Sequence, residues 1–223
     1  MKNIGIIVAD SGEFEPLLQR IGDCKNVGYF GRPCYEFSLN GYTVYAILSG
    51  IGKVNAAAAA MYLYHKNCDT ILNYGYSGGI SGVRKGDTVI ADSFLEHDFD
   101  LVCLGYKLCE KPEQEYIYSA DKLLVSLLKT ICPAAKCGRA VSGDCFVSDD
   151  RLRDTLKTVF KAASCDMETA AIASVCHQTG MRFASIRQIS DDAGNDATQS
   201  YREEAYSGNI APVDCIITLI NKL

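Results

Sequence analysis

The sequence predicts a three-layer α/β domain, with helices on both faces of a central mixed, mostly parallel sheet. Two observations lead to this prediction. Short β-rich runs alternate with helical runs of ten or more residues along the whole chain, which is typical of parallel strands joined by helices. The chain also has 223 residues, of which 48% are hydrophobic, so we expect one large core in a single domain spanning residues 1–223.

The predicted elements follow one another in a regular order. We expect strands where the β-rich runs lie, at residues 3–9, 42–50, 70–76, 87–94, 137–147 and 182–191. We expect helices at residues 55–66, 119–132, 169–180 and 211–223. Residues 96–116 form a polar excursion, and a long excursion is more often functional or interfacial than idle. Since ligands of such sheets bind beyond the carboxyl ends of the strands, polar residues just after each strand are candidate site residues.

Charge and hydropathy exclude two classes of partner. Basic residues number 22 against 27 acidic ones, the net charge is −5 and no long basic run occurs, so nothing provides the positive surface that nucleic acid requires. The N-terminal apolar stretch is only about five residues long, and no later run approaches the roughly 18 apolar residues of a membrane span. We therefore expect a soluble, cytoplasmic protein without nucleic acid or membrane partners.

Eleven cysteines raise the question of a disulfide framework or a metal site. Their number is odd, no C-x-x-C occurs, and most lie inside apolar segments such as "AVSGDCFV" and "VDCIITLI". We expect buried, reduced thiols that act as small hydrophobic residues. A metal site is equally unsupported, since only "HDFD" at residues 97–100 offers candidate ligands.

Two glycine-rich turns follow predicted strands. "SGIGKVNAAAA" at residues 49–59 suggests a phosphate-binding loop, but Val54 stands where Ser or Thr is required after Lys53, and Ile47 stands where the first glycine is required. "GYSGGI" at residues 75–80 permits close approach of the backbone to a ligand, although tight turns also use glycine for conformational reasons alone. Neither turn identifies a site by itself.

Three acidic residues each follow a predicted strand or precede a predicted helix, namely Glu13, Glu168 and Asp191. The helix dipole favours acidic residues in a first helical turn, which would explain Glu168 and its neighbour Asp166, and a Ser-Asp pair in "ISDDAG" would also suit a helix cap. Convergence on one cleft explains three distant acidic positions at strand ends better than capping does. No Ser-His-Asp or Cys-His arrangement is indicated.

Seven segments form a recognisable series: "IGII…GEFEPLL", "LSGIGKVNAA", "NYGYSGGI", "KGDTVIAD", "VSGDCFV", "DMETAAIASVC" and "RQISD". In order and spacing this series resembles the motifs of the methylthioadenosine/S-adenosylhomocysteine nucleosidases, in the nucleoside phosphorylase superfamily. The resemblance covers nearly the whole chain. "VSGD-F", "MEtaAiA" and "R-iSD" are the segments most specific for the superfamily, whereas the choice of a hydrolase within it depends on fewer residues.

The resemblance implies two catalytic carboxylates and a third at the sugar. Cleavage of an adenine N-glycosidic bond passes through an oxocarbenium-like ribose, so the base must be protonated and water supplied to the anomeric carbon. The resemblance implies that Asp191, placed with the help of Ser190, is the acid directed at adenine N7, and that Glu13 holds and deprotonates the water. It implies that Glu168 accepts hydrogen bonds from the ribose hydroxyls and favours the developing cation, while Met167 lies against the sugar.

The resemblance also implies the remaining substrate contacts. Phe146 would stack on adenine, and the backbone of Val147 would read the purine edge. Tyr201 falls where the family has an aromatic residue over the substrate, and residues 192–200 before it have the small polar composition of a mobile lid. The other implied substrate-binding residues are Ile51, Gly78 and Tyr76. The implied partner is a small adenine nucleoside, and no metal or organic cofactor is implied.

Water is expected as the nucleophile rather than phosphate. In bacterial phosphorylases of the superfamily an Arg and a Ser stand at the anomeric face, and the matching positions here hold Asn73 and Tyr76. An anionic Glu13 would also repel phosphate. Two alternatives remain open, a purine nucleoside phosphorylase and a non-catalytic nucleoside-binding relative, since Tyr76 replaces the small Ser usual in the nucleosidases and adds bulk beside the ribose.

A homodimer with shared sites is expected. Residues 97–112 carry an apolar cluster in a stretch too irregular for an ordinary core strand or helix, and its apolar members are Leu101, Val102, Leu104, Tyr106 and Leu108. Exposed to water, they would form an unusually large apolar patch for a monomer. The alternative is that they fold back on their own subunit. The nucleosidases pair two subunits about a twofold axis, and the resemblance implies that Leu104, where relatives often have Phe, reaches the partner's 5′ pocket.

Overall fold

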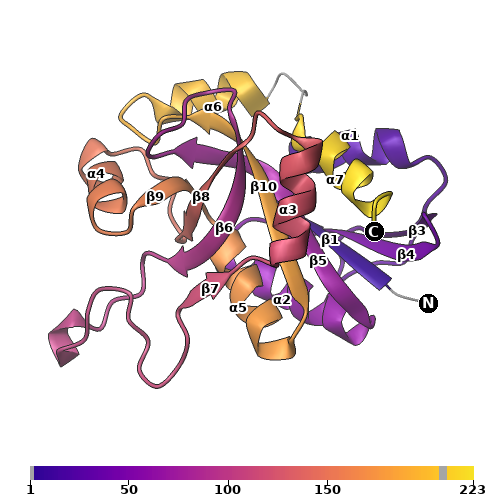
Figure 1. The fold of residues 1–223 in the computed structure, drawn as a ribbon, viewed down its shortest axis with the longest axis horizontal. Helices are drawn as coiled ribbons and strands as arrows, with labels where there is room; N and C mark the ends of the chain where they lie inside the picture. Colours follow the sequence, from indigo (N-terminus) through magenta and orange to yellow (C-terminus); the bar gives the residue numbers. More distant parts are fainter. Residues whose placement is uncertain (1–2, 206–209) are drawn as a thin grey trace.

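The computed structural model describes residues 3–205 and 210–223 and confirms the predicted architecture, a mixed sheet between two layers of helices (Figure 1). Every predicted strand and helix overlaps an observed one of the same kind. The strands are β1 (Asn3–Val8), β2 (Lys25–Asn26), β3 (Cys34–Leu39), β4 (Tyr42–Leu48), β5 (Cys68–Gly79), β6 (Thr88–Glu96), β7 (Ile117–Ser119), β8 (Lys136–Ser142), β9 (Ala162–Asp166) and β10 (Arg182–Asp191).

The prediction missed elements of both kinds, since the strands β2, β3, β7 and β9 and three of the α-helices were not expected. The helices are α1 (Ser11–Ile21), α2 (Lys53–His65), the 3₁₀ helix η1 (Val102–Leu104), α3 (Lys122–Ile131), α4 (Asp150–Thr158), α5 (Thr169–Thr179), α6 (Ala197–Ala205) and α7 (Pro212–Ile220). The helices α1, α4 and α6 were not predicted. α4 and α6 have nine residues each and a polar composition, which hides a short helix. α1 does carry an apolar stripe, at Phe14, Leu17, Leu18 and Ile21, which the prediction overlooked. None of the helices in residues 3–205 and 210–223 combines the length and the hydropathy needed to span a bilayer.

Five strands of the sheet close into a ring. β5 pairs with β10, β10 with β6, β6 with β8, β8 with β9, and β9 returns to β5, while β1, β4, β3 and β2 extend the sheet from the other side of β5. The longest pairings, β5 with β10 and β6 with β8, are parallel, in line with the mostly parallel sheet that we expected. β9 meets β5 only at the carboxyl ends of both strands, where Gly78 lies beside Cys165. The ring therefore brings several strand ends together on one side, where ligands of such sheets bind.

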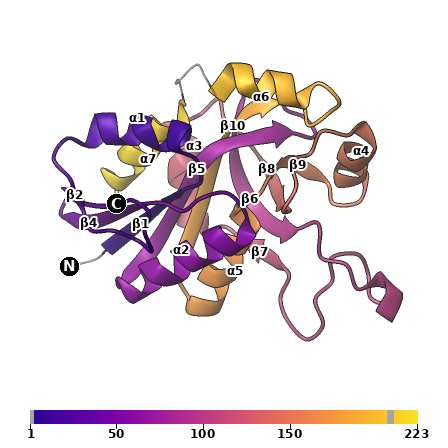
Figure 2. The same cartoon turned by 180° about the vertical axis from the view of Figure 1, so that it is seen from behind.

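Two separate hydrophobic cores cover the two faces of the sheet. On one face α2 and α5 pack together over a core that includes Leu63 and Ile172 (Figure 2). On the other face α1, α3 and α7 pack over a core that includes Leu17, Leu124 and Ile216 (Figure 1). Both faces of the strands are buried, which explains the nearly continuous apolar runs in β1 and β5.

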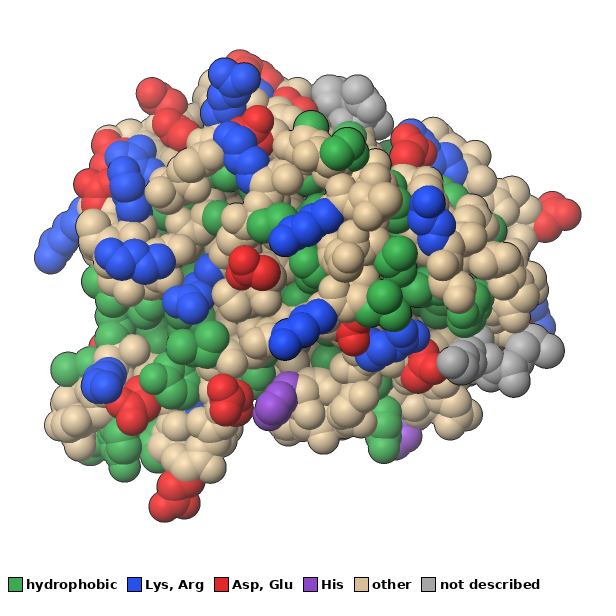
Figure 3. Space-filling view, viewed as in Figure 1, with side chains coloured by type: hydrophobic (Ala, Val, Ile, Leu, Met, Phe, Trp, Pro, Cys, Tyr) green, Lys and Arg blue, Asp and Glu red, His purple; other side chains and the backbone are tan. Residues whose placement is uncertain are grey.

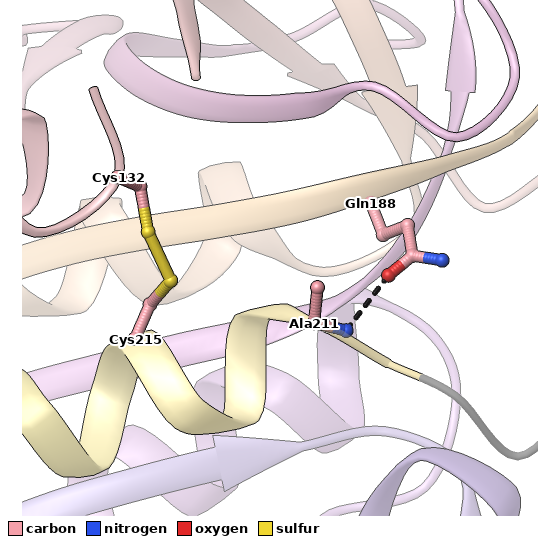
Figure 4. The surroundings of a disulfide bond; sticks show 4 residues. All are labelled: Cys132, Gln188, Ala211 and Cys215. Carbon is pink, nitrogen blue, oxygen red and sulfur yellow. Dashed lines mark hydrogen bonds between the residues drawn. A yellow bond between two sulfur atoms is a disulfide. The ribbon is translucent and has the colours of Figure 1, made fainter. Parts of the chain in front are cut away.

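The expectation that all cysteines are reduced is wrong for one pair. Cys132 at the end of α3 forms a disulfide with Cys215 in α7, with the two Cα atoms 6.8 Å apart (Figure 4). The spacing along the chain gave no sign of this pair, because the two cysteines meet only when α3 and α7 lie side by side. The expectation of burial holds for five of the nine remaining cysteines, whereas four are exposed: Cys24, Cys103, Cys137 and Cys145.

Residues 97–116 leave the sheet as a long projection that contains η1 (Figure 1, lower left). Hydrophobic side chains gather over this projection in the space-filling view (Figure 3). Val102 is 50% exposed and Leu104 is 68% exposed. The apolar side chains at these positions are therefore not folded back onto the body of their own chain.

Candidate active site

A pocket of about 360 Å³ opens at the carboxyl ends of β1, β5, β9 and β10, a volume within the usual range for sites of small molecules. Every residue for which the sequence predicted contact with a ligand lines this pocket, except Leu104, which lies on the projection. The lining residues are Ala9, Asp10, Glu13, Ile51, Tyr76, Ser77, Gly78, Cys145, Phe146, Val147, Cys165, Asp166, Met167, Glu168, Ser190, Asp191 and Tyr201.

A buried arginine, to which the sequence analysis gave no role, contacts the acidic residues at the floor of the pocket. Arg187 in β10 is only 1% exposed, and its Nη2 lies 2.8 Å from Asp166 Oδ2 and 3.5 Å from Glu168 Oε2. A Cβ at Gly75 would lie 2.3 Å from Arg187 Nη1 and 2.8 Å from Glu13 Oε1, so only glycine leaves room for both side chains there. The guanidinium therefore faces three carboxylates and compensates the charges that they bring into the floor.

The sequence left open whether Asp166 and Glu168 cap a helix or belong to a site, and the structure shows that each does one of the two. Asp166 caps α5, because its Oδ1 accepts the N–H groups of Glu168 at 3.1 Å and Thr169 at 3.0 Å. Glu168 makes no capping bond, and its Oε1 instead accepts the N–H of Gly52 across the pocket at 2.9 Å. Burial raises the pKa of the Glu168 carboxyl, against the opposing effect of Arg187. Capping by Asp166 thus leaves Glu168 available at the pocket.

Glu13 lies in the first turn of α1, just beyond the end of β1. The side chain is buried, and its Oε1 accepts the N–H of Tyr76 at 2.6 Å. Burial raises the pKa of the Glu13 carboxyl to about 7, because desolvation outweighs the opposing effects of Arg187 and the Tyr76 N–H. A carboxylate with a pKa close to neutrality is suited to accept a proton from a bound water.

Asp191 lies at the end of β10 on the other side of the pocket. It accepts the hydroxyl of Ser190 at 2.7 Å and the N–H of Ala193 at 2.8 Å. Burial raises the pKa of the Asp191 carboxyl, although both hydrogen bonds oppose this change. A carboxyl that holds its proton more tightly than usual is suited to protonate a leaving group.

Three aromatic rings form one wall of the pocket. Tyr201 on α6 meets Phe146 at 5.6 Å between ring centroids and Tyr76 at 6.3 Å, both edge to face. The expected lid at residues 192–200 is only partly a loop, because α6 already begins at Ala197. Tyr201 is therefore presented by a helix.

Two further polar features bear on what the site binds. Ser77 Oγ is buried in the pocket and has no hydrogen-bond partner among the described residues, so a polar atom of a ligand would satisfy it. Its position in a glycine-rich turn gave no signal in the sequence.

Lys53 Nζ pairs with Glu96 at 3.0 Å and Asp98 at 2.5 Å, away from the pocket, which agrees with the failed match to a phosphate-binding loop. No cluster of three metal-ligating side chains occurs in residues 3–205 and 210–223.

Comparisons with known proteins agree with this geometry. The family model described as "Phosphorylase superfamily" matches residues 3–214. The chain is 33% identical over 230 residues to the 5′-methylthioadenosine/S-adenosylhomocysteine nucleosidase of Halalkalibacterium halodurans, with 100% of both chains covered. It resembles a crystal structure of the Helicobacter pylori enzyme of that name with a TM-score of 0.96, at 26% identity, covering 100% of this chain and 99% of that one.

The chain also resembles a second Helicobacter pylori structure. It is an aspartate-to-asparagine variant of the nucleosidase with 5′-methylthioadenosine in the active site. Its TM-score against this chain is 0.93, at 25% identity, with 100% of both chains covered.

The raised pKa of Glu13 predicts a measurable dependence of stability on pH. The folded-state pKa of about 7 lies above the ordinary value of 4.5, so the folded chain holds a proton that the unfolded chain has released. The resulting stabilisation is fully present below the ordinary value and is lost as pH rises through about 7. Between pH 5 and pH 8 we expect the free energy of unfolding of the wild type to fall by about 2 to 3 kcal/mol relative to Glu13→Gln. Urea unfolding of both proteins tests this, and parallel pH profiles would contradict it.

Proposed function

The chain belongs to the phosphorylase superfamily. From the carboxylates of its pocket and the names of its relatives, we propose that it hydrolyses the N-glycosidic bond of 5′-thio-substituted adenosines. The proposed substrates are methylthioadenosine and S-adenosylhomocysteine, and the products are adenine and the thioribose. The curated relative and the solved structures carry the names of nucleosidases for these two compounds, which supports this substrate class.

The convergence of three distant carboxylates carries the proposal. Glu13, Glu168 and Asp191 come from different parts of the chain and line one pocket. Departure of adenine requires an acid at the base, an activated water at the anomeric carbon and negative charge beside the cationic ribose. One carboxylate for each requirement explains why the fold buries all three, whereas binding without cleavage would not need them all.

Asp191 is the proposed acid. Its raised pKa favours the protonated form that can donate to adenine N7, and the Ser190 hydroxyl orients the carboxyl. Phe146 stacks on the adenine and the Val147 backbone reads its edge. Gly78 supports this arrangement, because a Cβ there would lie 3.1 Å from Asp191 Oδ1 and crowd the acid.

Glu13 is the proposed base for the attacking water. The Tyr76 N–H holds one carboxylate oxygen at 2.6 Å and leaves the other available for water. Glu168 accepts hydrogen bonds from the ribose hydroxyls, and Met167 lies against the sugar. Ile51, Tyr76 and Tyr201 complete the walls of the pocket around the substrate.

The surroundings of Asn73 favour water over phosphate as the nucleophile. Asn73 is buried, and its amide donates to the carbonyl of Ile7 at 2.9 Å and accepts the hydroxyl of Ser185 at 2.9 Å. A side chain engaged in this way inside the sheet does not present a donor to phosphate. The purine nucleoside phosphorylase therefore remains the second candidate, supported only by the shared superfamily.

An assay of several adenine nucleosides with and without phosphate tests the proposal. Purified protein should release adenine and the free thioribose from methylthioadenosine at the same rate under both conditions. Turnover that requires phosphate, with a sugar phosphate as product, would identify the phosphorylase instead. Binding without any turnover would identify the non-catalytic alternative.

Substitution of the two proposed catalytic carboxylates should separate their roles. Asp191→Asn should fold normally and release base at least about 10²-fold more slowly, because it loses a positioned acid. Glu13→Gln should still bind nucleoside but not hydrolyse it, since an amide can hold water without accepting its proton. Calorimetric binding and single-turnover kinetics measure both effects. A rate close to that of the wild type in either variant would remove that residue from the mechanism.

We also propose a homodimer in which the projection at residues 97–112 reaches the partner's 5′ pocket. The exposed apolar side chains of the projection support this, since Leu104 contacts no part of the pocket of its own chain. Leu104→Asp would place a charge in the apolar contact, and we expect dissociation, a raised KM for 5′-alkylthio substrates, or both. Sedimentation and kinetics measure these outcomes. A fully active dimer of the variant would refute the shared site.

A further inference from the structure

Side chains from the neighbouring strands β5 and β10 contact α6, the helix that carries Tyr201. Tyr76 in β5 lies directly opposite Gln188 in β10, in the parallel register of the two strands. Tyr76 is 7% exposed and Gln188 is 6% exposed, so both side chains are buried beneath α6. Gln188 has no role in the mechanism proposed above.

Both side chains contact the same residue of α6. The Gln188 amide nitrogen donates to Glu204 Oε1 at 2.8 Å, and the Tyr76 hydroxyl donates to the Glu204 carbonyl at 3.4 Å. The Gln188 amide oxygen accepts the N–H of Ala211, just before α7, at 2.9 Å (Figure 4). One glutamine amide thus joins the end of α6 to the beginning of α7.

Among the described residues α6 is held by the buried Ala197, by the packing of Tyr201 against Phe146 and Tyr76, and by the contacts to Glu204. It has nine residues with a polar composition, and a helix of this length is not stable by itself in water. Lys85 also donates to the Ser200 carbonyl at 3.0 Å and lies 3.5 Å from Glu203 and 3.9 Å from Glu204, but its side chain is 39% exposed and such contacts contribute little. The partly buried hydrogen bonds from Gln188 and Tyr76 to Glu204 are therefore the stronger polar attachment of α6.

Fixing Glu204 also fixes Tyr201. The two residues are three apart in the same helix, so they lie on the same face, one turn from each other. Tyr201 lines the pocket and meets Phe146 edge to face. Any rotation or shift of α6 moves this ring relative to the pocket.

We propose that Gln188 and Tyr76, through Glu204, form a clasp that holds α6 so that Tyr201 closes the pocket. Gln188 is then a positioning residue that acts on substrate affinity through Tyr201 and does not touch the reacting atoms. The effect on affinity rests on the proposed function, whereas the effect on the position of α6 does not. Loss of the clasp should raise KM and leave kcat nearly unchanged, because the interaction is lost from the ground state and the transition state alike.

A reversed hydrogen bond tests the clasp. Gln188→Glu places a carboxylate against Glu204, and we expect KM for methylthioadenosine to rise about tenfold with kcat within about twofold of the wild type. Adding Glu204→Gln lets the new amide donate to the new carboxylate, and the double variant should recover most of the wild-type KM. Glu203→Gln is the matched control, since this exposed residue makes no contact with Gln188 among the described side chains.

A cycle with Tyr201 tests the route of the effect. In the background of Tyr201→Ala, Gln188→Glu should cause no further rise in KM, because the ring that the clasp positions is already absent. If the two substitutions raise KM additively, the effect of the clasp does not pass through Tyr201. Gln188→Leu removes the hydrogen bonds to Glu204 and Ala211 without adding a charge, so it replaces Gln188→Glu if that variant does not fold.

Hydrogen exchange provides a readout that needs no substrate. Backbone amides of α6 should exchange about tenfold faster in Gln188→Glu than in the wild type, and the double variant should reverse this, while amides of β1 stay unchanged. Unchanged exchange in α6 would overturn the clasp. If the wild type cleaves no nucleoside, the proposed function fails, and the exchange result still decides whether the clasp exists.

Discussion

The buried charge of Arg187 is the constraint on which the site depends. Three carboxylates face the pocket floor at Asp166, Glu168 and Glu13, and such groups cannot remain buried together without an internal cation. With the guanidinium in place, Asp166 can cap α5, Glu168 can reach across to Gly52, and Glu13 can stay in the first turn of α1. Each of these placements brings a separate element of the fold to the pocket.

The two catalytic carboxylates illustrate how one environment can prepare opposite functions. Burial raises the pKa of both Glu13 and Asp191. For Asp191 the raised pKa favours the protonated acid. For Glu13 it brings the pKa of the base close to neutral pH. The hydrogen bonds differ accordingly, since Asp191 receives a hydroxyl and a backbone N–H from its own strand end, whereas Glu13 receives its N–H from the distant β5.

Much of the fold and the three carboxylates could be predicted from residue patterns, and most other pocket residues from the family resemblance, whereas the rest depended on contacts between distant segments. Glu13, Glu168 and Asp191 were identified because each follows a strand or precedes a helix, and strand ends converge in this class of sheet. Arg187 was not assigned, because within an apolar strand its charge has meaning only once Asp166 and Glu168 are seen beside it. The helices α1, α4 and α6 were not predicted, and polar composition explains this for α4 and α6. Leu104 has no contact within the described chain that would test its predicted role in a partner's pocket.

The disulfide between α3 and α7 changes what happens to the chain when it unfolds. Cys132 and Cys215 are 83 residues apart, and the loop between them contains Phe146, Glu168, Asp191 and Tyr201. In the chain-entropy model, closing a loop of that length destabilises the unfolded ensemble by about 4.5 kcal/mol at 25 °C. Oxidation therefore stabilises the folded chain, and with it the pocket, without adding any contact to the pocket itself. The lifetime of the folded site then depends on the thiol and disulfide balance of its surroundings.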